Sequence, residues 1–186
     1  MKLGIYIGSF NPPHKGHINV VNYLLEKQII DKILIVPTKE YWNKQNLAPL
    51  QDRINMLNFF ETEDIIIDAE HNEYEYTYEL MRVLKEKYPD AELHLIIGAD
   101  NIINFHKWKN YEELLQYKII IMNRGNIDID KYIINYPNAN FIVLKDFKNL
   151  DISSTKIRNN LNDRYLDKKV LQYIKKNKLY RRWYYD

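Results

Sequence analysis

The sequence has 186 residues, which suits one domain with a buried core and leaves too little chain for a second full domain. Hydrophobic residues make up 46% and charged residues 28%, so we expect an ordinary globular protein and exclude a disordered segment. The formal net charge of +2 is too small to indicate a nucleic-acid-binding protein, and the absence of cysteine excludes disulfides and catalytic thiols.

The ends of the chain carry no strong targeting or membrane signal. Met1 and Lys2 lead into only five mostly apolar residues before Gly8, and no apolar run approaches the roughly 20 residues of a membrane span. We therefore predict a cytoplasmic protein. Basic pairs gather at 168–169, 175–176 and 181–182, where a solvated helical face is the preferred interpretation over an RNA-binding patch.

The first stretch of the chain predicts a strand that runs into an anion-binding loop. Residues 3–7 have the apolar character of a buried strand, Gly8 ends it, and helical spacing begins at His17. His14 and His17 thus lie beside a helix N-terminus, which attracts phosphate. We expect both to donate hydrogen bonds, with positive charge if protonated. A metal site or two surface histidines are the alternatives, and zinc is the weaker of these because no cysteine completes a ligand set.

Strands and helices alternate along the rest of the chain. Strands are predicted at 32–36, 64–68, 92–97, 118–122 and 140–144. Helices are predicted at 52–60, 78–87 (with Thr77 as N-cap), 111–116, 128–136, 167–177, and from an N-cap within 152–155 to residue 161. The polar segment 38–49, which contains Lys44, is expected to be a long functional loop.

This alternation predicts a doubly wound parallel α/β sheet, in which ligands bind at the carboxyl ends of the strands. Five segments follow predicted strands and could therefore line one crevice: 8–17, 37–44, 98–100, 123–125 and the turn before Ser153. Neither G-x-x-x-x-G-K-[ST] nor G-x-G-x-x-G follows any strand, so a bound nucleotide would be held by a different device.

Two motifs resemble those of a known superfamily. Residues 8–17, G-S-F-N-P-P-H-K-G-H, resemble the G-[ST]-F-[DN]-P-x-H-x-G-H signature of the nucleotidylyltransferases, and residues 152–158, I-S-S-T-K-I-R, look like their I-S-S-T-x-x-R motif. Within that superfamily the chain most resembles the bacterial nicotinate-nucleotide adenylyltransferases, over almost its whole length. Supporting matches lie at 76–77, 97–100, 105 and 108, 124–125 and 170–180.

The resemblance implies a Rossmann-like nucleotidylyltransferase fold in a single domain, residues 1–186, with residues 151–186 as its C-terminal helical part. It also implies an enzyme that transfers the adenylyl group of ATP to nicotinic acid mononucleotide, giving deamido-NAD and pyrophosphate without a covalent intermediate. Mg²⁺ is expected to bridge the ATP phosphates, largely through water, so no dedicated protein ligands to a metal are required.

The resemblance also implies roles for particular residues. His14, His17 and Arg158 would be catalytic, the two histidines on the ATP phosphates and Arg158 on the leaving pyrophosphate. Asp100 would accept from a ribose hydroxyl. The implied ATP-binding residues are Gly8, Ser9, Phe10, His14, Gly16, His17, Gly98, Asp100, Ile152, Ser153, Ser154 and Arg158.

The implied residues for the second substrate are Lys44, Thr77, Trp108, Lys109 and Arg124. Trp108 would stack on the pyridine ring, although a core aromatic is the plainer interpretation, and Thr77 would meet its carboxylate unless it is only a helix cap. The chain departs from the family where Lys109 replaces a tyrosine and where residues 41–43 replace Pro-Pro-His. Lys109 either favours the acid through its charge or, as we prefer, points to solvent.

Several alternatives stay open at the level of sequence. The substrate could be nicotinamide mononucleotide or phosphopantetheine, or the chain could be a cytidylyltransferase or a nucleotide-binding module without turnover. A class I aminoacyl-tRNA synthetase is disfavoured because no K-M-S-K-S-like segment occurs. We expect no nucleic-acid or membrane partner, and the sequence does not indicate an oligomeric state.

Overall fold

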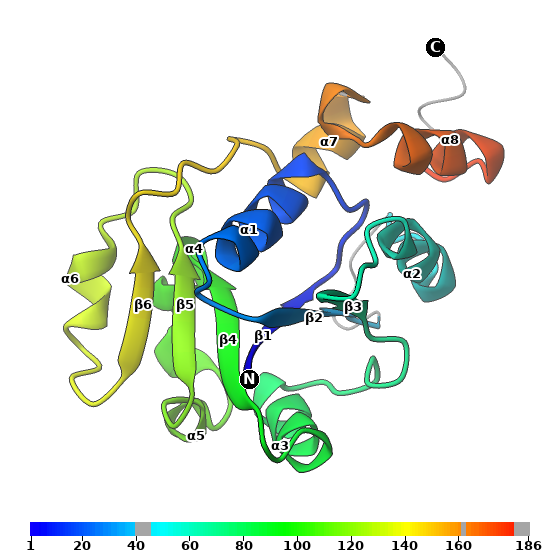
Figure 1. The fold of residues 1–186 in the computed structure, drawn as a ribbon. Helices are drawn as coiled ribbons and strands as arrows, with labels where there is room; N and C mark the ends of the chain where they lie inside the picture. Colours follow the sequence, from blue (N-terminus) through cyan, green and yellow to red (C-terminus); the bar gives the residue numbers. More distant parts are fainter. Residues whose placement is uncertain (40–45, 161–162, 181–186) are drawn as a thin grey trace.

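The computed structural model describes residues 1–39, 46–160 and 163–180. Its centre is a six-stranded sheet in the order β3-β2-β1-β4-β5-β6, in which all neighbouring strands are parallel (Figure 1). The strands are β1 (Lys2–Gly8), β2 (Lys32–Pro37), β3 (Ile65–Ile67), β4 (Glu92–Gly98), β5 (Lys118–Met122) and β6 (Asn140–Leu144). The predicted doubly wound parallel sheet is confirmed.

Helices cover both faces of this sheet. They are α1 (Lys15–Glu26), α2 (Leu50–Asn58), α3 (Thr77–Lys87), α4 (Ala99–Ile103), α5 (Tyr111–Leu114), α6 (Ile129–Ile133), α7 (Ser154–Asn160) and α8 (Lys168–Lys176). Short 3₁₀ turns lie at η1 (Phe105–Lys107) and η2 (Asp163–Tyr165).

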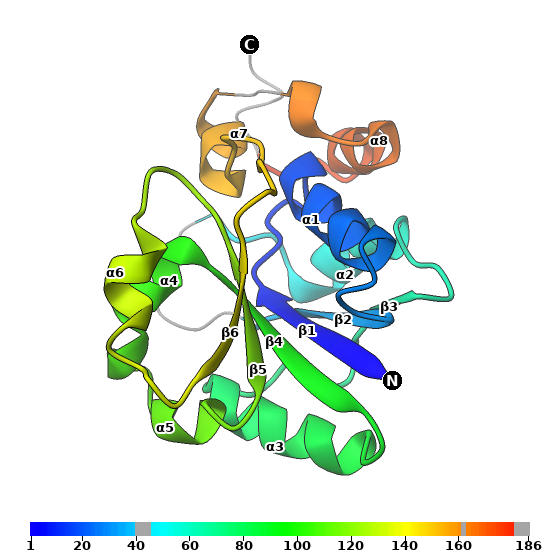
Figure 2. The same ribbon diagram turned by 60° about the vertical axis from the view of Figure 1, so that its left-hand side comes forward.

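The alternation of side chains along each strand divides the core between the two faces. In β1, Leu3 and Ile5 pack in a cluster with buried residues of α3, α4, α5 and Ile129 of α6, whereas Tyr6 packs with α1 and α2 on the other face. Figure 2 shows α1 and α2 on the side of the sheet opposite α3 and α5. The strands are apolar on both faces because both faces are buried.

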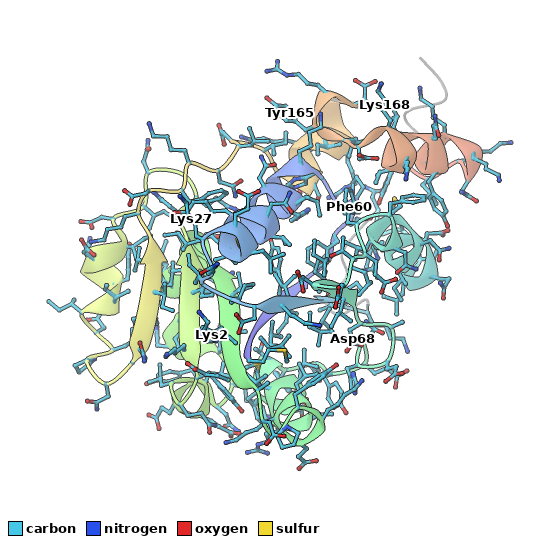
Figure 3. The ribbon with its side chains drawn as sticks, in the orientation of Figure 1. Lys2, Lys27, Phe60, Asp68, Tyr165 and Lys168 are labelled. Carbon is cyan, nitrogen blue, oxygen red and sulfur yellow. The ribbon has the colours of Figure 1, made fainter. Side chains whose placement is uncertain are left out.

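The C-terminal helices α7 and α8 lie beyond the sheet, next to the start of α1 and to α2 (Figure 1). A third apolar cluster joins Met56 of α2 to Ile157 of α7 and to Val170 and Ile174 of α8. Figure 3 shows Tyr165 and Lys168 at the link from α7 to α8, and partly buried Tyr165 packs against the same cluster. These helices therefore share a core with the body of the protein.

The topology opens a crevice between β1 and β4. From β1 the chain proceeds outward through β2 to β3, and from β4 it proceeds in the opposite direction through β5 to β6. The strands therefore diverge at the β1/β4 pair, and ligands bind outside the carboxyl ends at such a switch point. Gly8 ends β1 there and Gly98 ends β4.

The structure corrects several predicted boundaries. Helix α1 begins at Lys15 with His14 as its N-cap, two residues before the predicted start. The prediction of Thr77 as an N-cap is wrong: Tyr76 is the N-cap of α3, and its backbone N–H is 3.4 Å from the Glu79 Oε2. Helix α4, η1 and η2 were not predicted, because segments of three to five residues are too short to show helical periodicity.

Within the described part of the chain, no helix combines the length and apolar character needed to cross a membrane.

Candidate active site

A cavity of about 600 Å³ opens at the carboxyl ends of β1, β4 and β5. It receives residues from three of the five segments that were predicted to meet there, namely 8–17, 98–100 and 123–125. Ser153 to Thr155 line it directly after the fourth segment, and Leu47 lines it from the predicted loop 38–49. Among the residues predicted to bind ATP, those that line it are Gly8, Ser9, Phe10, His14, His17, Gly98, Ser153, Ser154 and Arg158.

The two histidines are held by the backbone at the start of α1. The Nδ1 atom of His14 accepts from the Gly16 N–H at 3.0 Å, and the Nδ1 atom of His17 accepts from the His14 N–H at 3.1 Å. The rings stack with centroids 3.7 Å apart. Because each Nδ1 accepts, a neutral ring carries its hydrogen on Nε2. Both rings line the cavity, so both can present an Nε2–H donor to a ligand there.

Burial keeps both imidazoles neutral in the absence of a ligand. Burial, with a smaller contribution from the charge of Arg124, lowers the pKa of His14 to about 3. Burial, the neighbouring His14 and Arg124 together hold the pKa of His17 well below its ordinary value of 6.5. The expected alternative of protonated histidines is therefore not the state of the free protein near neutral pH. The site offers neutral hydrogen-bond donors.

Two glycines let this loop fold tightly. A Cβ on Gly16 would lie 2.8 Å from Cε1 and 2.9 Å from Nδ1 of His14, so only glycine lets that ring cap the helix. A Cβ on Gly8 would lie 3.2 Å from the ring of Phe10. Phe10 has a φ of 48°, which is uncommon for a bulky residue, and its buried ring meets His17 edge to face at 4.9 Å. Gly16 thus leaves room for the His14 ring, and the Phe10 ring packs against His17.

Arg158 on α7 brings a cation to the same cavity. Its Nη1 donates to the Asn11 carbonyl oxygen at 2.6 Å, and burial lowers its pKa from the usual value. Ser153 accepts from the Lys156 N–H through its Oγ at 3.1 Å, and the Ser154 hydroxyl donates to the Pro12 carbonyl oxygen at 2.8 Å. The start of α7 is therefore bonded directly to the loop before α1.

Arg53 is a polar side chain in this region that sequence reasoning missed. It is 0% exposed, and it donates to the carbonyl oxygens of Ser9, Thr38 and Ala48 at 2.8, 2.7 and 2.9 Å. It thus ties the loop after β1 to the loop after β2 and to the start of α2. No local pattern could have indicated this, because an arginine on an amphipathic helix normally faces solvent.

Some predicted ATP-site residues do not line the cavity. Gly16 leaves room for the ring of His14. Ile152 is buried in the third apolar cluster and lies next to Gly16. Asp100 is exposed, and its neighbour Asn101 on α4 lines the cavity instead. Arg124, predicted to bind the second substrate, lies on the cavity with the histidines.

Thr77, Trp108 and Lys109, which were also predicted for the second substrate, lie outside the lining of this cavity. Trp108 is half-buried and packs against Phe105 with ring centroids 5.3 Å apart. Lys109 places its Nζ 4.5 Å from the ring centroid of Tyr76, the residue before Thr77. Lys109 and the start of α3 are therefore neighbours, and Lys109 is exposed to solvent, as preferred from the sequence, while its ammonium lies over the Tyr76 ring. Lys44 lies outside the described residues.

The donor set around the cavity suits a metal that arrives with its nucleotide. The described lining contains hydroxyls and basic groups but no carboxylate, and no cluster of three metal-binding side chains occurs among the described residues. Mg²⁺ carried by ATP phosphates and held through water would fit such a lining, because it needs few direct protein ligands.

Comparison with known proteins gives a consistent result. The cytidylyltransferase-like family matches residues 5–160. A probable nicotinate-nucleotide adenylyltransferase of Flavobacterium psychrophilum is 33% identical over 98% of this chain and 100% of its own length. One of Fusobacterium nucleatum is 37% identical over 95% of this chain and 98% of its own.

Solved structures similar to this chain are also those of nicotinic acid mononucleotide adenylyltransferases. The Plasmodium falciparum nicotinic acid mononucleotide adenylyltransferase complexed with NaAD has a TM-score of 0.81 and 25% identity, covering 97% of each chain. The same enzyme complexed with APC has a TM-score of 0.80.

Proposed function

The chain belongs to the nicotinate-nucleotide adenylyltransferase family of nucleotidyltransferases, and we propose that it uses the cavity at β1 and β4 to make deamido-NAD. In this reaction the phosphate of nicotinic acid mononucleotide attacks the α-phosphorus of ATP. A new P–O bond forms, the bond between the α-phosphorus and the bridging oxygen breaks, and pyrophosphate leaves with that oxygen. No proton has to be removed from an ionised phosphate nucleophile, so the protein's task is to position the groups and stabilise charge.

The observation that carries the proposal is the convergence of two Nε2–H donors and two guanidinium groups on one cavity at the switch point of the sheet. His14 and His17 donate to the ATP phosphates, with His17 on the transferring group. Arg158 and Arg124 supply positive charge, with Arg158 on the leaving pyrophosphate. Neutral histidines serve this purpose because preorganised N–H donors need no proton uptake when charge shifts during transfer.

The remaining residues of the site divide between the two substrates. Gly8, Ser9, Phe10 and Gly98 allow the nucleotide to approach the strand ends closely, and Asn101 or Asp100 meets a ribose hydroxyl. Thr77, Trp108 and Lys109 receive the pyridine end of the mononucleotide. The position of Lys109 beside Tyr76 supports a preference for the acid over the amide. Mg²⁺, entering with ATP, neutralises phosphate charge.

Purified protein with ATP and Mg²⁺ is offered nicotinic acid mononucleotide, nicotinamide mononucleotide and phosphopantetheine in separate reactions, and pyrophosphate release is followed. We expect the highest kcat/KM with nicotinic acid mononucleotide. Release with phosphopantetheine alone would favour that alternative, and release with none of the three would refute the proposal. A cytoplasmic location and the absence of a nucleic-acid partner stay predictions from the sequence, which indicates no oligomeric state.

A further inference from the structure

The C-terminal part of the chain is bonded to the loop before α1 through several side chains. Lys15 Nζ, on the first residue of α1, donates to Arg164 O at 3.1 Å. Among the described residues, the hydrogen bonds from the C-terminal part that reach the loop itself run from Ser154 Oγ to Pro12 O at 2.8 Å, from Arg158 Nη1 to Asn11 O at 2.6 Å, and from Tyr180 Oη to Asn11 Oδ1 at 2.6 Å. Two of these bonds end on Asn11, so this residue of the loop is bonded both to α7, through Arg158, and to the chain after α8, through Tyr180.

Asn11 is held in one orientation. Its side chain is buried, with Oδ1 accepting from the Ala48 N–H at 3.0 Å and from the Tyr180 hydroxyl, while Nδ2 donates to the Asn46 carbonyl oxygen at 3.0 Å. Two donors on one side and a carbonyl on the other leave no choice of amide orientation. The backbone carbonyl of the same residue accepts from Arg158, so fixing the side chain of Asn11 also fixes the acceptor that aims Arg158.

The chain after α8 folds back to reach Asn11. Lys178 and Tyr180 both adopt left-handed backbone conformations, with φ of 52° and 58°. Such a conformation is unfavourable for a residue with a side chain, and it persists where surrounding contacts hold it. Here the contacts include Leu179, which packs against the third apolar cluster while its N–H donates to the Ile174 carbonyl oxygen at 3.1 Å.

We propose that Tyr180 is a positioning residue for ATP binding, acting through Asn11 on Arg158. The proposal rests on the proposed function of the cavity. Tyr180 is not among the described residues that line the ATP cavity; with Lys178 it lines a second hollow, and Arg158 lines both. Its link to the ATP cavity is the hydrogen bond to Asn11, whose carbonyl oxygen accepts from Arg158. The segment after α8 thus contributes to the site that begins at residue 8.

Tyr180→Phe removes the hydroxyl and retains the ring. We expect it to weaken ATP binding about threefold to tenfold, which corresponds to the loss of one hydrogen bond of ordinary net strength. The KM for ATP should rise with it, while the KM for the mononucleotide changes less than twofold. The affinity for a non-hydrolysable ATP analogue is measured by calorimetry, so the result does not depend on turnover and is obtained even if the substrate proposed above is wrong.

Tyr173→Phe is the matched control. The Tyr173 hydroxyl also joins the C-terminal part to the body, donating to Asp52 Oδ1 at 2.7 Å and accepting from Asn55 Nδ2 at 2.9 Å, but Tyr173 is not bonded to the loop before α1. We expect Tyr173→Phe to lower the melting temperature at least as much as Tyr180→Phe and to leave ATP affinity unchanged. Equal effects of the two variants on ATP affinity, or no effect of Tyr180→Phe, would overturn the proposal.

The route through Arg158 is tested by combining substitutions. If Tyr180 acts by aiming Arg158, then Tyr180→Phe should cause no further loss of ATP affinity in a protein that already carries Arg158→Met. Fully additive losses would show that Tyr180 acts by another route, and would contradict this part of the proposal.

Discussion

His17 is the residue on which the chemical proposal depends most. Its Nδ1 is occupied by the His14 N–H and its ring is pressed between His14 and Phe10, so Nε2–H has one direction in which to donate. Rotation of the ring would break the bond to the backbone. The geometry therefore favours a fixed, neutral donor over a proton carrier.

His17→Ala should lower kcat about tenfold to a thousandfold, the range seen when a preorganised donor to developing charge is lost. His17→Gln retains a neutral N–H donor on its side-chain amide and should recover part of this loss. Steady-state kinetics with saturating ATP measures both. Unchanged kcat in His17→Ala would exclude a transition-state role, and a His17→Gln as inactive as His17→Ala would argue against a neutral donor.

Gly16 should matter to activity more than its position in a helix suggests. Alanine is normally the better helix residue, but a Cβ here would lie under 3.0 Å from a ring held by its own bond to the Gly16 N–H. We expect Gly16→Ala to displace His14 and to lower kcat about tenfold or more.

Gly4→Ala is the control for this substitution. Its Cβ would lie 2.8 Å from Ile30 Cδ1, a similar crowding inside the core, and Gly4 itself does not line the cavity. Gly4→Ala should lower the melting temperature and leave kcat within about twofold, measured well below that temperature. Gly16→Ala with unimpaired kcat would show that the His14 ring can move without consequence.

The buried histidines also predict how stability depends on pH. The pKa of His14 is lowered to about 3 in the folded protein, whereas histidine in an unfolded chain titrates near 6.5. Between these values the unfolded chain binds more protons, so the free energy of unfolding falls as the pH falls below about 6.5.

His14→Asn keeps an acceptor for the N-cap and removes the titrating group. The urea concentration at the unfolding midpoint should therefore depend less steeply on pH between 6.5 and 4 in this variant than in the wild-type protein, because one group fewer takes up a proton on unfolding. If the unfolding midpoints of the two proteins depended equally on pH, this result would contradict a neutral, buried His14.

At the scale of elements, the sequence predicted what local patterns determine. Strands β5 and β6 agree residue by residue with the predicted apolar runs bounded by polar turns. Ser153, within the predicted N-cap segment 152–155, accepts from the Lys156 N–H, and Asp167, predicted as the first residue of the last helix, is its N-cap. The boundary at α3 was wrong because Thr77 satisfies the residue preference for an N-cap although Tyr76 occupies the position.

Contacts between distant elements could not be predicted in this way. Arg53 bonds Ser9 across 44 residues, and Tyr180 bonds Asn11 across 169 residues. No periodicity or spacing encodes these pairs, because they exist only after the sheet has brought its carboxyl ends together. The motif residues of the site were predicted from the sequence, whereas the residues that hold them were not.

Helix α8 supports the site from a distance through its packing on α2. Ile174 is 0% exposed in the third apolar cluster, so Ile174→Ala should lower the free energy of unfolding by about 2 to 5 kcal/mol. Exposed Lys175 on the same helix is the control, and Lys175→Ala should change it by less than about 0.5 kcal/mol.

We propose that the C-terminal helical part unfolds together with the sheet as one domain, because it shares a cluster with α2. Ile174→Ala should then shift a single denaturation transition as a whole. A separate early transition in this variant would show that residues after 150 form an independent unit.

At the scale of the whole molecule, the fold assembles the site from both ends of the chain. The loop after β1 supplies the histidines, the strand end of β4 supplies a glycine and Asn101, and α7 supplies Arg158. A parallel sheet that diverges at β1 and β4 leaves room for a nucleotide there, and α7 lines the same cavity. The family's reaction requires such an arrangement because its catalysis consists of holding two phosphate-bearing substrates in line.

The identity of the products tests this account most directly. The protein is incubated with ATP, Mg²⁺ and nicotinic acid mononucleotide, and the products are separated and identified by mass. We predict deamido-NAD and pyrophosphate in equal amounts, with neither ADP nor free AMP accumulating. Release of ADP or AMP in place of the dinucleotide, or no consumption of the mononucleotide, would contradict adenylyl transfer at this site.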